Sequence, residues 1–207
     1  MRRRRTSGVK IAAPPRWFHP IVPEMQRDTD RAEPGAQPIL VAGDPRLRQR
    51  ARPIGAADAE LAQTVAELGA TLAAFRRRHG FGRAIAAPQI GRAQRVIAVD
   101  LGAGPFALVN PEIDWRSAET FELWDDCFSV PDQLVRVRRH ASISLAFCDE
   151  QLRPRRWDRL PADLAELIQH EVDHLDGILF TDHLRGLRRE RSRRQLKKLA
   201  ADQEVMV

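Results

Sequence analysis

Two histidines and a glutamate in the segment QHEVDHLDG, residues 169–177, are the residues of this chain best suited to chemistry. His170 and His174 stand four positions apart, so on a helix both imidazoles project from one face. Two neutral imidazoles placed in this way bind one divalent metal ion. Glu171 follows the first histidine, where its carboxylate can take a proton from a water on that metal. The pattern therefore indicates metal-assisted hydrolysis.

A motif of this length also occurs by chance on surface helices that bind no metal, so it remains a hypothesis. Asp173, inside the motif, either orients a ligand or is a solvated charge, and the solvated charge is the favoured interpretation. A catalytic metal needs a third protein ligand and an open position. The candidates are His183, His140, several carboxylates and the two cysteines.

Two cysteines are too few for a secreted disulfide scaffold of this size, which indicates a reducing compartment and free thiols. Cys148 follows the apolar run SISLAF and is expected to be a buried structural residue. Cys127 lies among Asp125, Asp126 and Ser129, where simple core packing is less favourable. Its thiolate would be a strong metal ligand.

Helices and strands that could position these side chains are visible in the hydrophobic pattern. Apolar residues at spacings of three and four predict a helix over residues 57–78, with Gly80 beyond its basic last turn. A second helix, from about Ala162 to Leu175 after Pro161, carries the histidines. Alternating or β-branched runs predict strands at 95–101, 106–113, 134–139 and 142–147, and a further short strand within 176–184.

The order of these elements, helix, strands and then helix, predicts the α+β fold class. We expect mixed or antiparallel strands packed around the central metal-binding helix, and a basic C-terminal helix from about Leu187 to Ala201. Three regions follow: a Pro- and Arg-rich N-terminal arm (1–37), a catalytic domain (38–186) and a basic C-terminal helix or tail (187–207). The length of 207 residues fits one domain with extensions at its ends.

The net charge of +6 is concentrated near the C-terminus. Residues 184–199 carry a charge of +7, whereas the rest of the chain has 26 basic and 27 acidic side chains. Such a segment is either a solvated charged face or a binding site for a nucleic-acid backbone. No run reaches about 18 apolar residues, so no membrane span is expected. The N-terminus lacks the apolar region of a secretory signal, a transit peptide is a less favoured alternative, and we expect a cytoplasmic protein.

Three segments, in this order, resemble the motifs of the peptide deformylase family. GRAIAAPQIG (82–91) resembles G-x-G-Φ-A-A-x-Q-Φ-G, where Φ is an apolar residue, and DDCFS (125–129) resembles E-G-C-Φ-S. HEVDH (170–174) matches H-E-x-D-H in full, and the stretch ILVAGDPRLRQRARPI is similar to the family's usual start. The resemblance covers about residues 38–183, and three ordered motifs are far more specific than any one of them.

The resemblance implies one divalent metal ion held by Cys127, His170 and His174, with a fourth position open to water. Members of the family commonly use Fe(II), and they tolerate zinc, nickel or cobalt. Glu171 would be the general acid and base. The implied reaction is hydrolysis of the formyl group from N-formylmethionine on nascent peptides, with release of formate.

The same resemblance assigns the Gln89 amide and the backbone N–H of Phe128 to the oxyanion formed during attack on the formyl group. An amide suits this role because it donates a hydrogen bond without titrating. Gly82, Ala84 and Ile85 would line an extended peptide substrate, which pairs with the enzyme like an added strand. The methionine side chain would enter an apolar pocket nearby.

Three positions depart from the family pattern, and all three belong to the expected substrate-binding residues. Ala84 replaces a glycine and would be strained at a positive φ. Asp126 replaces the glycine before the ligand cysteine and adds negative charge beside the metal. Asp125 replaces a glutamate and shortens a side chain near the methionine pocket. These changes leave the ligands, the base and the oxyanion amide intact.

Two other functions stay open. The altered positions suggest a related hydrolase that acts on a different N-acyl or N-formyl substrate. The basic tail suggests a ribosome-binding protein whose metal site is catalytically idle. Bacterial deformylases can carry a basic C-terminal helix that contacts the ribosome, and residues 187–207 are similar in character. The expected partners are therefore the nascent formyl-Met peptide and the ribosome, and no membrane.

Overall fold

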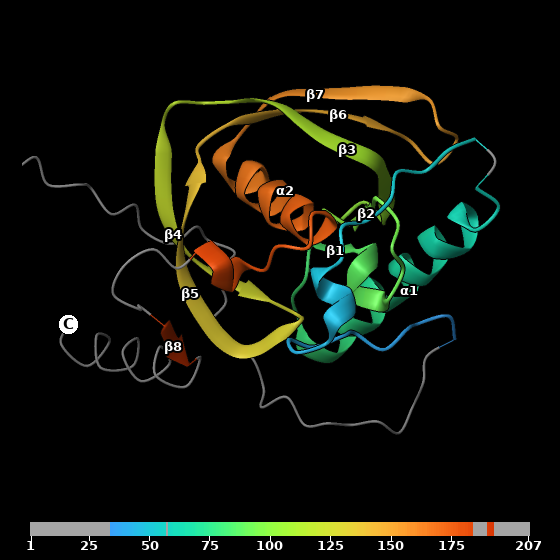
Figure 1. Cartoon of the computed structure of the whole chain (residues 1–207), viewed down its shortest axis with the longest axis horizontal. Coiled ribbons are helices and arrows are strands. Elements are labelled where there is room, and N and C mark those ends of the chain that lie inside the picture. Colours follow the sequence, from blue (N-terminus) through green and yellow to red (C-terminus); the bar gives the residue numbers. More distant parts are fainter. Residues whose placement is uncertain (1–33, 57, 184–189, 193–207) are drawn as a thin grey trace, which may run out of the picture.

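The computed structural model describes residues 34–56, 58–183 and 190–192 (Figure 1). These ranges contain two α-helices, eight strands and three short 3₁₀ helices. The α-helices are α1 (Leu61–His79) and α2 (Ala162–Leu175), and the 3₁₀ helices are Pro45–Arg48, Ala87–Ile90 and Phe180–His183. The strands are β1 (Ala84–Ala86), β2 (Val96–Val99), β3 (Phe106–Arg116), β4 (Thr120–Cys127), β5 (Val130–His140), β6 (Ile143–Cys148), β7 (Pro154–Leu160) and β8 (Glu190–Ser192).

The strands form two antiparallel sheets that curve around helix α2 (Figure 1). Five strands make the larger sheet in the order β1-β2-β3-β6-β7, and three make the smaller one in the order β4-β5-β8. β1 pairs with β2 so that Ala84 faces Val99 and Ala86 faces Ile97. Among the described strands β1 has no partner on its other side, so it is an edge of the larger sheet.

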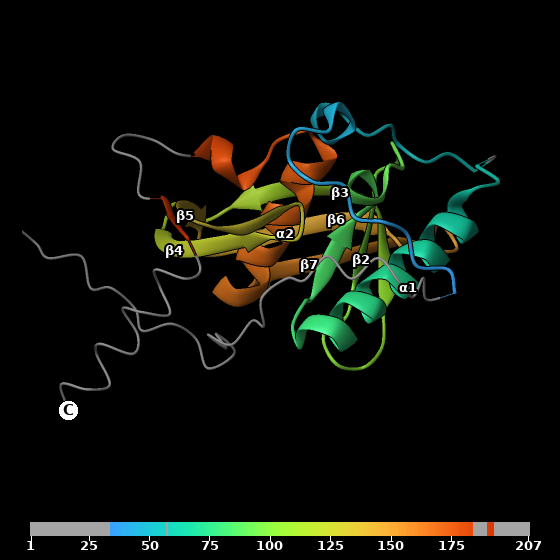
Figure 2. The same ribbon diagram turned by 90° about the horizontal axis from the view of Figure 1, so that it is seen from below.

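The two helices cover opposite faces of the larger sheet, as the two views in Figures 1 and 2 show. Strand β2 is buried along its whole length because its side chains alternate between the two sides. Ile97 and Val99 join the α2 core, whereas Val96 and Ala98 join the α1 core. The histidine-bearing helix therefore lies inside the molecule, with β1 along one side of it.

The predicted α+β fold class is confirmed, and several predicted elements agree with the structure. The helix predicted from about Ala162 to Leu175 is α2 with the same bounds. The helix predicted over residues 57–78 is α1, which begins at Leu61 because Asp58 first forms a turn that caps the backbone N–H of Glu60. α1 ends at Gly80, whose φ of 77° is left-handed. The four interior strand predictions correspond to β2, β3, β5 and β6.

One predicted strand is wrong, and four strands, β1, β4, β7 and β8, were not predicted as strands. Residues 176–184 were expected to contain a strand, but Phe180–His183 form a 3₁₀ helix, because Asp182 accepts a hydrogen bond from the Leu179 backbone and closes the turn. β1 is too short to show a period of its own. β7 (PRRWDRL) is too polar to read as a strand, since it lies at the sheet edge and leaves most of its side chains exposed.

Most of the predicted basic C-terminal helix lies outside the described residues. The three residues within it that the structure describes, Glu190–Ser192, form strand β8 and not a helix. β8 pairs with β5, with Leu134 opposite Arg191. Pairing satisfies backbone groups at the β5 edge, whereas the weak apolar stripe of the segment offers little that a helix could bury. Among the described helices, none is long and apolar enough to cross a membrane.

Candidate metal centre

Helix α2 is fixed at both ends by residues that suit its termini. Pro161 precedes its first turn in an extended conformation. Beyond its end, Gly177 has a φ of +74°, and a Cβ atom there would lie 2.5 Å from the Arg48 carbonyl oxygen. No other residue fits that contact without displacing the backbone. The helix therefore stops at a fixed point, which sets the position of His174 in its last turn.

Cys127 comes from the other sheet, at the end of β4. A two-residue turn, Phe128 and Ser129, connects it to β5, and Cys127 faces Val130 in the register. The Ser129 backbone N–H donates to Cys127 Sγ at 3.4 Å. The Ser129 carbonyl accepts from the Ala42 backbone at 2.7 Å. This tight hairpin presents the thiol to the face of α2 that carries the histidines.

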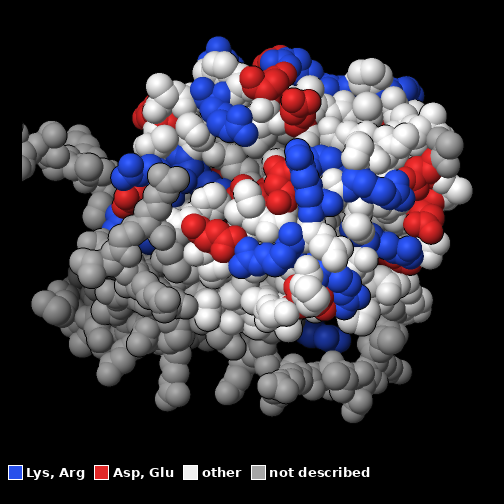
Figure 3. All heavy atoms as spheres, in the orientation of Figure 1, with Lys and Arg blue, Asp and Glu red and all other residues white. Residues whose placement is uncertain are grey.

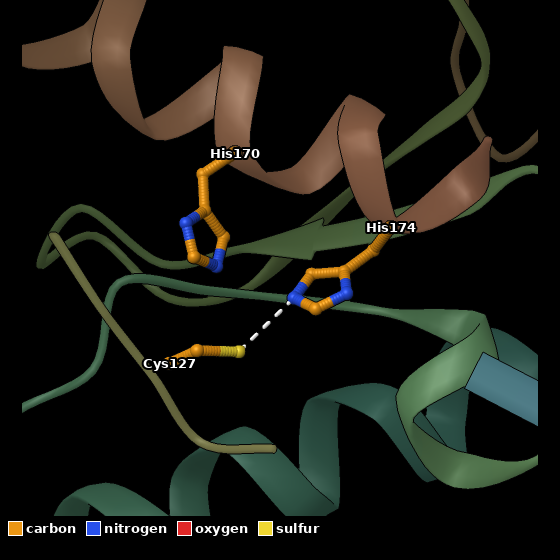
Figure 4. A group of neighbouring side chains, drawn as sticks. All are labelled: Cys127, His170 and His174. Atoms are coloured by element: carbon orange, nitrogen blue, oxygen red, sulfur yellow. Dashed lines mark hydrogen bonds between the residues drawn. The ribbon is translucent and has the colours of Figure 1, made fainter. Parts of the chain in front are cut away.

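Cys127, His170 and His174 lie together, and all three are buried (Figure 4). One ligand atom from each lies within 4.8 Å of the others, and Cys127 Sγ is 3.1 Å from His174 Nε2. Ligand atoms that share one tetrahedral metal are roughly 3.5 Å apart, given metal–nitrogen and metal–sulfur bonds of about 2.1 and 2.3 Å. Burial lowers the pKa of His174 to about 3, so its imidazole is neutral, as a ligand must be. The donor set and its spacing fit a divalent metal.

A network of buried charged side chains contacts the Nδ1 side of the His170 ring. Asp125 lies 3.0 Å from His170 Nδ1, which directs the Nε2 lone pair toward Cys127. Arg139 Nη2 donates to the same carboxylate at 3.0 Å, and Arg139 Nη1 donates to Asp173. His183 Nε2 lies 2.7 Å from Asp173. Asp125 thus contacts a metal-ligand candidate, and the favoured interpretation of Asp173 as a solvated charge is wrong, because Arg139 and His183 engage it.

This network also governs protonation. Burial alone would raise the pKa of Asp125, but His170 and Arg139 lower it to about 2. Burial alone would lower the pKa of His170, but Asp125 and then Cys127 raise it well above its ordinary value. Arg139 was not singled out in the sequence, where it is one of several basic residues in an alternating strand. No pattern within β5 marks it, since its partners come from β4 and α2.

Glu171 is buried on the same helix, and its Oε2 atom has no hydrogen-bond partner among the described residues. Burial raises the pKa of its carboxyl to about 7, and the nearby Asp125 and Glu166 raise it further, against the opposing effects of His170 and Arg83. A carboxyl with a pKa near neutrality can both accept and return a proton. The open oxygen leaves room for a water or a substrate atom as its partner.

Gln89 is fixed through one end of its amide and directed toward the centre by the other. Its Oε1 accepts from the Ala86 backbone N–H at 2.8 Å. Its Nε2 donates to Ser129 Oγ at 3.2 Å and lies 3.7 Å from Cys127 Sγ. The carbonyl end closes the 3₁₀ turn after β1, and the NH₂ end has a second hydrogen that faces the cluster.

The expected substrate-binding residues surround this centre in different ways. Gly82 has a φ of +122°, and a Cβ there would lie 2.9 Å from the Phe128 ring, so glycine is required. Ala84 and Ile85 are buried in β1, and Ala84 is not among the residues with positive φ, so the anticipated strain is absent. Asp126 is exposed.

Arg83 and Glu166 form an ion pair beside the centre that sequence reasoning missed. Arg83 Nη2 pairs with Glu166, and Arg83 Nη1 donates to the Asp163 carbonyl at 3.1 Å. Burial raises the pKa of Glu166 to about 6, although Arg83 opposes the shift. A glutamate four residues before His170, on the same helix face as that histidine, was the available signal.

A buried thiol and two imidazoles lie beside a fixed amide donor and a glutamate whose Oε2 has no hydrogen-bond partner among the described residues, and together they define a candidate metallohydrolase centre. The family model described as polypeptide deformylase matches residues 36–190. The peptide deformylase of Mesorhizobium japonicum is 34% identical over 174 residues, which are 80% of this chain and 94% of that protein. The chain belongs to the peptide deformylase family.

Solved structures agree with this assignment. The peptide deformylase of Thermotoga maritima superposes with a TM-score of 0.65 at 34% identity, covering 72% of this chain and 97% of that one. A Met-Ala-Ser-bound peptide deformylase from Acinetobacter baumannii gives a TM-score of 0.64 at 29% identity, covering 72% and 98%. Both matches span nearly the whole of the solved chain, 97% and 98% of its length.

Proposed function

We propose that this protein is a metal-dependent deformylase that hydrolyses the formyl group from N-formylmethionyl peptides. Water attacks the formyl carbon, the carbon–nitrogen bond breaks, and formate and a free amino terminus result. The observation that carries the proposal is the buried cluster of Cys127, His170 and His174 beside Glu171, whose Oε2 lacks a partner among the described residues. The family assignment supplies the substrate class.

Cys127, His170 and His174 would hold the metal, and Fe(II) is the proposed ion, with zinc, nickel or cobalt as substitutes. A mixed thiolate and imidazole set suits these borderline-soft ions. When bound, such an ion supplies a Lewis acid that polarises the formyl carbonyl and lowers the pKa of a water molecule.

The side chains of this protein carry the proton and the developing charge. Glu171 takes a proton from the attacking water and returns one to the leaving nitrogen, which its pKa of about 7 allows. The Gln89 Nε2 amide, which here donates to Ser129 Oγ and to Cys127 Sγ, and the backbone N–H of Phe128 would donate to the oxyanion. Both donors are held in place before substrate arrives, Gln89 by Ala86 and Phe128 by the hairpin turn.

The edge of β1 is the proposed binding strand for the peptide. A substrate that adds to this edge lies between β1 and the Phe128 turn, above α2. Gly82 allows the Phe128 ring to approach, and Ala84 and Ile85 keep the edge regular. Asp126, exposed next to Cys127, stays a proposed substrate contact, while Asp125 serves His170.

Formate release from formyl-Met-Ala-Ser tests the proposal. Metal-free protein is loaded anaerobically with Fe(II), Ni(II) or Zn(II), and acetyl-Met-Ala-Ser is the matched control. Turnover of the formyl peptide alone supports a deformylase. Turnover of the acetyl peptide instead would favour the related N-acyl hydrolase, and no turnover with stoichiometric metal would favour the idle ribosome-binding protein.

The ribosome is the proposed partner of the basic tail. The face shown in Figure 3 has acidic and basic side chains side by side among the described residues. The surplus of positive charge belongs to residues 184–199. We keep the division into an arm (1–37), a catalytic domain (38–186) and a tail (187–207), and we propose a cytoplasmic location, where nascent chains are made.

Removal of residues 193–207 tests the tail without disturbing β8, which pairs with β5. Ribosome binding measured by cosedimentation should weaken, and the full chain should lose binding steeply as salt rises. Turnover of the tripeptide should be unchanged. Equal binding by the truncated and full chains would reject the ribosome contact.

A further inference from the structure

The ion pair between Arg83 and Glu166 has no part in the chemistry proposed above. It joins the residue before β1 to the second turn of α2, and Arg83 also donates to the Asp163 carbonyl at 3.1 Å. The Glu166 side chain is 7% exposed and that of Arg83 is 27% exposed. A buried carboxylate paired with a half-buried guanidinium is costly to desolvate, and it lies here on the helix face that also carries His170.

The position of this pair relative to the catalytic groups is fixed by α2. Glu166 precedes His170 by four residues, so the two side chains are neighbours on one helix face, about 6 Å apart. Both members of the pair act electrostatically on Glu171, and they do so in opposite directions. The ion pair therefore lies within about one helical turn of the reacting groups.

The first side chain of a substrate must reach the same region. Only the amide nitrogen separates the formyl carbon from the first α-carbon, so that α-carbon lies roughly 2.5 Å from the reacting atom. In the proposed binding mode the peptide adds to the edge of β1, the strand that begins directly after Arg83. β1 packs against α2, and Glu166 of α2 is paired with Arg83, so a first side chain of methionine's length directed toward α2 would approach this ion pair.

Building on the deformylase function, we propose that the Arg83–Glu166 pair contacts the first side chain of the substrate and widens specificity to polar ends. The substrate class is N-formyl peptides whose first side chain has the length of methionine but carries a hydrogen-bonding group, such as glutamine or methionine sulfoxide. Arg83 donates to the amide or sulfoxide oxygen, and Glu166 accepts from an amide NH₂. A purely apolar end would leave both charged groups poorly solvated.

The test compares kcat/KM within one enzyme preparation for formyl-Met-Ala-Ser, formyl-Gln-Ala-Ser and formyl-norleucine-Ala-Ser, which cancels differences in metal loading. The wild-type value for the glutamine peptide should lie within about tenfold of that for methionine, since the polar end is hydrogen-bonded. In the double variant Arg83→Leu/Glu166→Leu, the preference for methionine over glutamine should rise by about tenfold or more. In the same variant, kcat/KM for the norleucine peptide should rise relative to the glutamine peptide by a similar factor.

Arg92 and Glu67 provide a matched control. Their pair has similar exposure, 28% and 11%, but joins α1 to the loop after Ile90. The variant Arg92→Leu/Glu67→Leu should leave the substrate ratios unchanged. The single variant Glu166→Gln guards against misfolding of the double variant, because it keeps size and removes only charge. It should raise turnover of formyl-Glu-Ala-Ser relative to formyl-Gln-Ala-Ser about tenfold, since carboxylate repulsion is removed.

Binding of the products Met-Ala-Ser and Gln-Ala-Ser, measured by calorimetry, gives a second readout that does not depend on turnover. If the enzyme hydrolyses formyl-Met-Ala-Ser but the ratios of kcat/KM between peptides are the same in the wild type and in both Arg83–Glu166 variants, the specificity role is wrong. The deformylase function would still hold in that case. No turnover of any formyl peptide, with product affinities that still shift in the variants, would reject deformylation while supporting the contact. Unchanged product affinities would reject the contact in either case.

Discussion

Two groups of buried carboxylates, Glu166 and Glu171 on helix α2 and the pair of Asp173 on α2 with Asp125 on β4, differ in the cations beside them. In one group, Glu171 Oε2 has no hydrogen-bond partner within the described part of the chain, and Glu166 pairs with the partly exposed Arg83. Toward the smaller sheet, Asp125 is held by Arg139 and His170, and Asp173 by Arg139 and His183. All four side chains are largely buried, so burial alone does not separate the groups.

The pKa values show what the difference does. Burial raises the pKa of Glu171 to about 7 and that of Glu166 to about 6. In the other group, the pKa of Asp125 falls to about 2, because His170 and Arg139 outweigh the effect of burial. A carboxyl near neutrality can carry protons, whereas a permanently ionised one can only hold its neighbours. The same functional group thus serves as a reactant or as an anchor, depending on the partners that the fold supplies.

The largest expected effect comes from removing the proton carrier. Glu171→Gln keeps the size of the side chain and should lower kcat for formate release by about 10²–10⁴-fold, because the amide cannot take the proton that the carboxylate accepts. Metal content, measured on the same sample by elemental analysis, should stay at the wild-type level. Wild-type turnover in this variant would show that Glu171 is not the base.

Loss of the shared cation should be the most damaging change on the anchor side. Arg139→Met leaves Asp125 and Asp173 buried without their common partner and should lower the free energy of unfolding by about 3–5 kcal/mol. Urea unfolding measures it. Arg138→Met, on the adjacent and largely exposed residue paired with Glu122, is the control and should change stability by under about 1 kcal/mol. If both variants lose a similar free energy of unfolding, Arg139 stabilises the fold no more than a surface arginine does, and this part of the account is wrong.

A smaller effect, on metal affinity, distinguishes Asp125, which orients His170, from Glu171, which is proposed to carry the proton. Asp125→Asn should weaken metal affinity by about 10–100-fold, because His170 loses the acceptor that orients it. Competition with a chelator gives the dissociation constant. The control, Asp126→Asn, alters the exposed neighbour and should leave the constant unchanged. Turnover of Asp125→Asn should recover at saturating metal, and persistent loss there would place Asp125 in the chemistry.

The smallest expected effect is a pH dependence of stability in the metal-free protein. The Glu171 carboxyl has a pKa of about 7 when folded and 4.5 as its ordinary value. The protonated Glu171 carboxyl therefore contributes to the free energy of unfolding in full below pH 4.5. This contribution falls by about 1–2 kcal/mol as the pH rises through about 7. Asp125 behaves oppositely, since its contribution is present above 3.8 and lost as pH falls through about 2. The difference in the free energy of unfolding between pH 5 and pH 8 should be smaller in Glu171→Gln than in the wild type. An equal difference in both would contradict the raised pKa of Glu171.

Sequence patterns singled out the candidate metal ligands and the proposed base because these residues lie in short ordered motifs. His170, Glu171 and His174 share one helix, and the period that predicts α2 also predicts which face they occupy. The fold class followed from the order of helical and strand-like runs. The resemblance, more than the spacing, singled out Cys127 among several candidate third ligands.

The residues that sequence reasoning missed act through contacts between distant segments. Asp125 and His170 are 45 positions apart, and Arg139 and Asp173 are 34 apart, so no local pattern could pair them. Arg83 lies inside the first motif, but its partner Glu166 is 83 positions away. β7 was missed for a different reason, because an edge strand rich in arginine has no hydrophobic alternation to detect.

A titration with Co(II) tests the central claim most directly, because thiolate coordination to cobalt gives a charge-transfer absorption band. We predict one equivalent of Co(II) per chain, with the band present in the wild type and in Glu171→Gln but absent in Cys127→Ser. Formate release measured on the same cobalt-loaded samples should be present only in the wild type. A thiolate band that survives in Cys127→Ser, or turnover that survives in Glu171→Gln, would contradict the account.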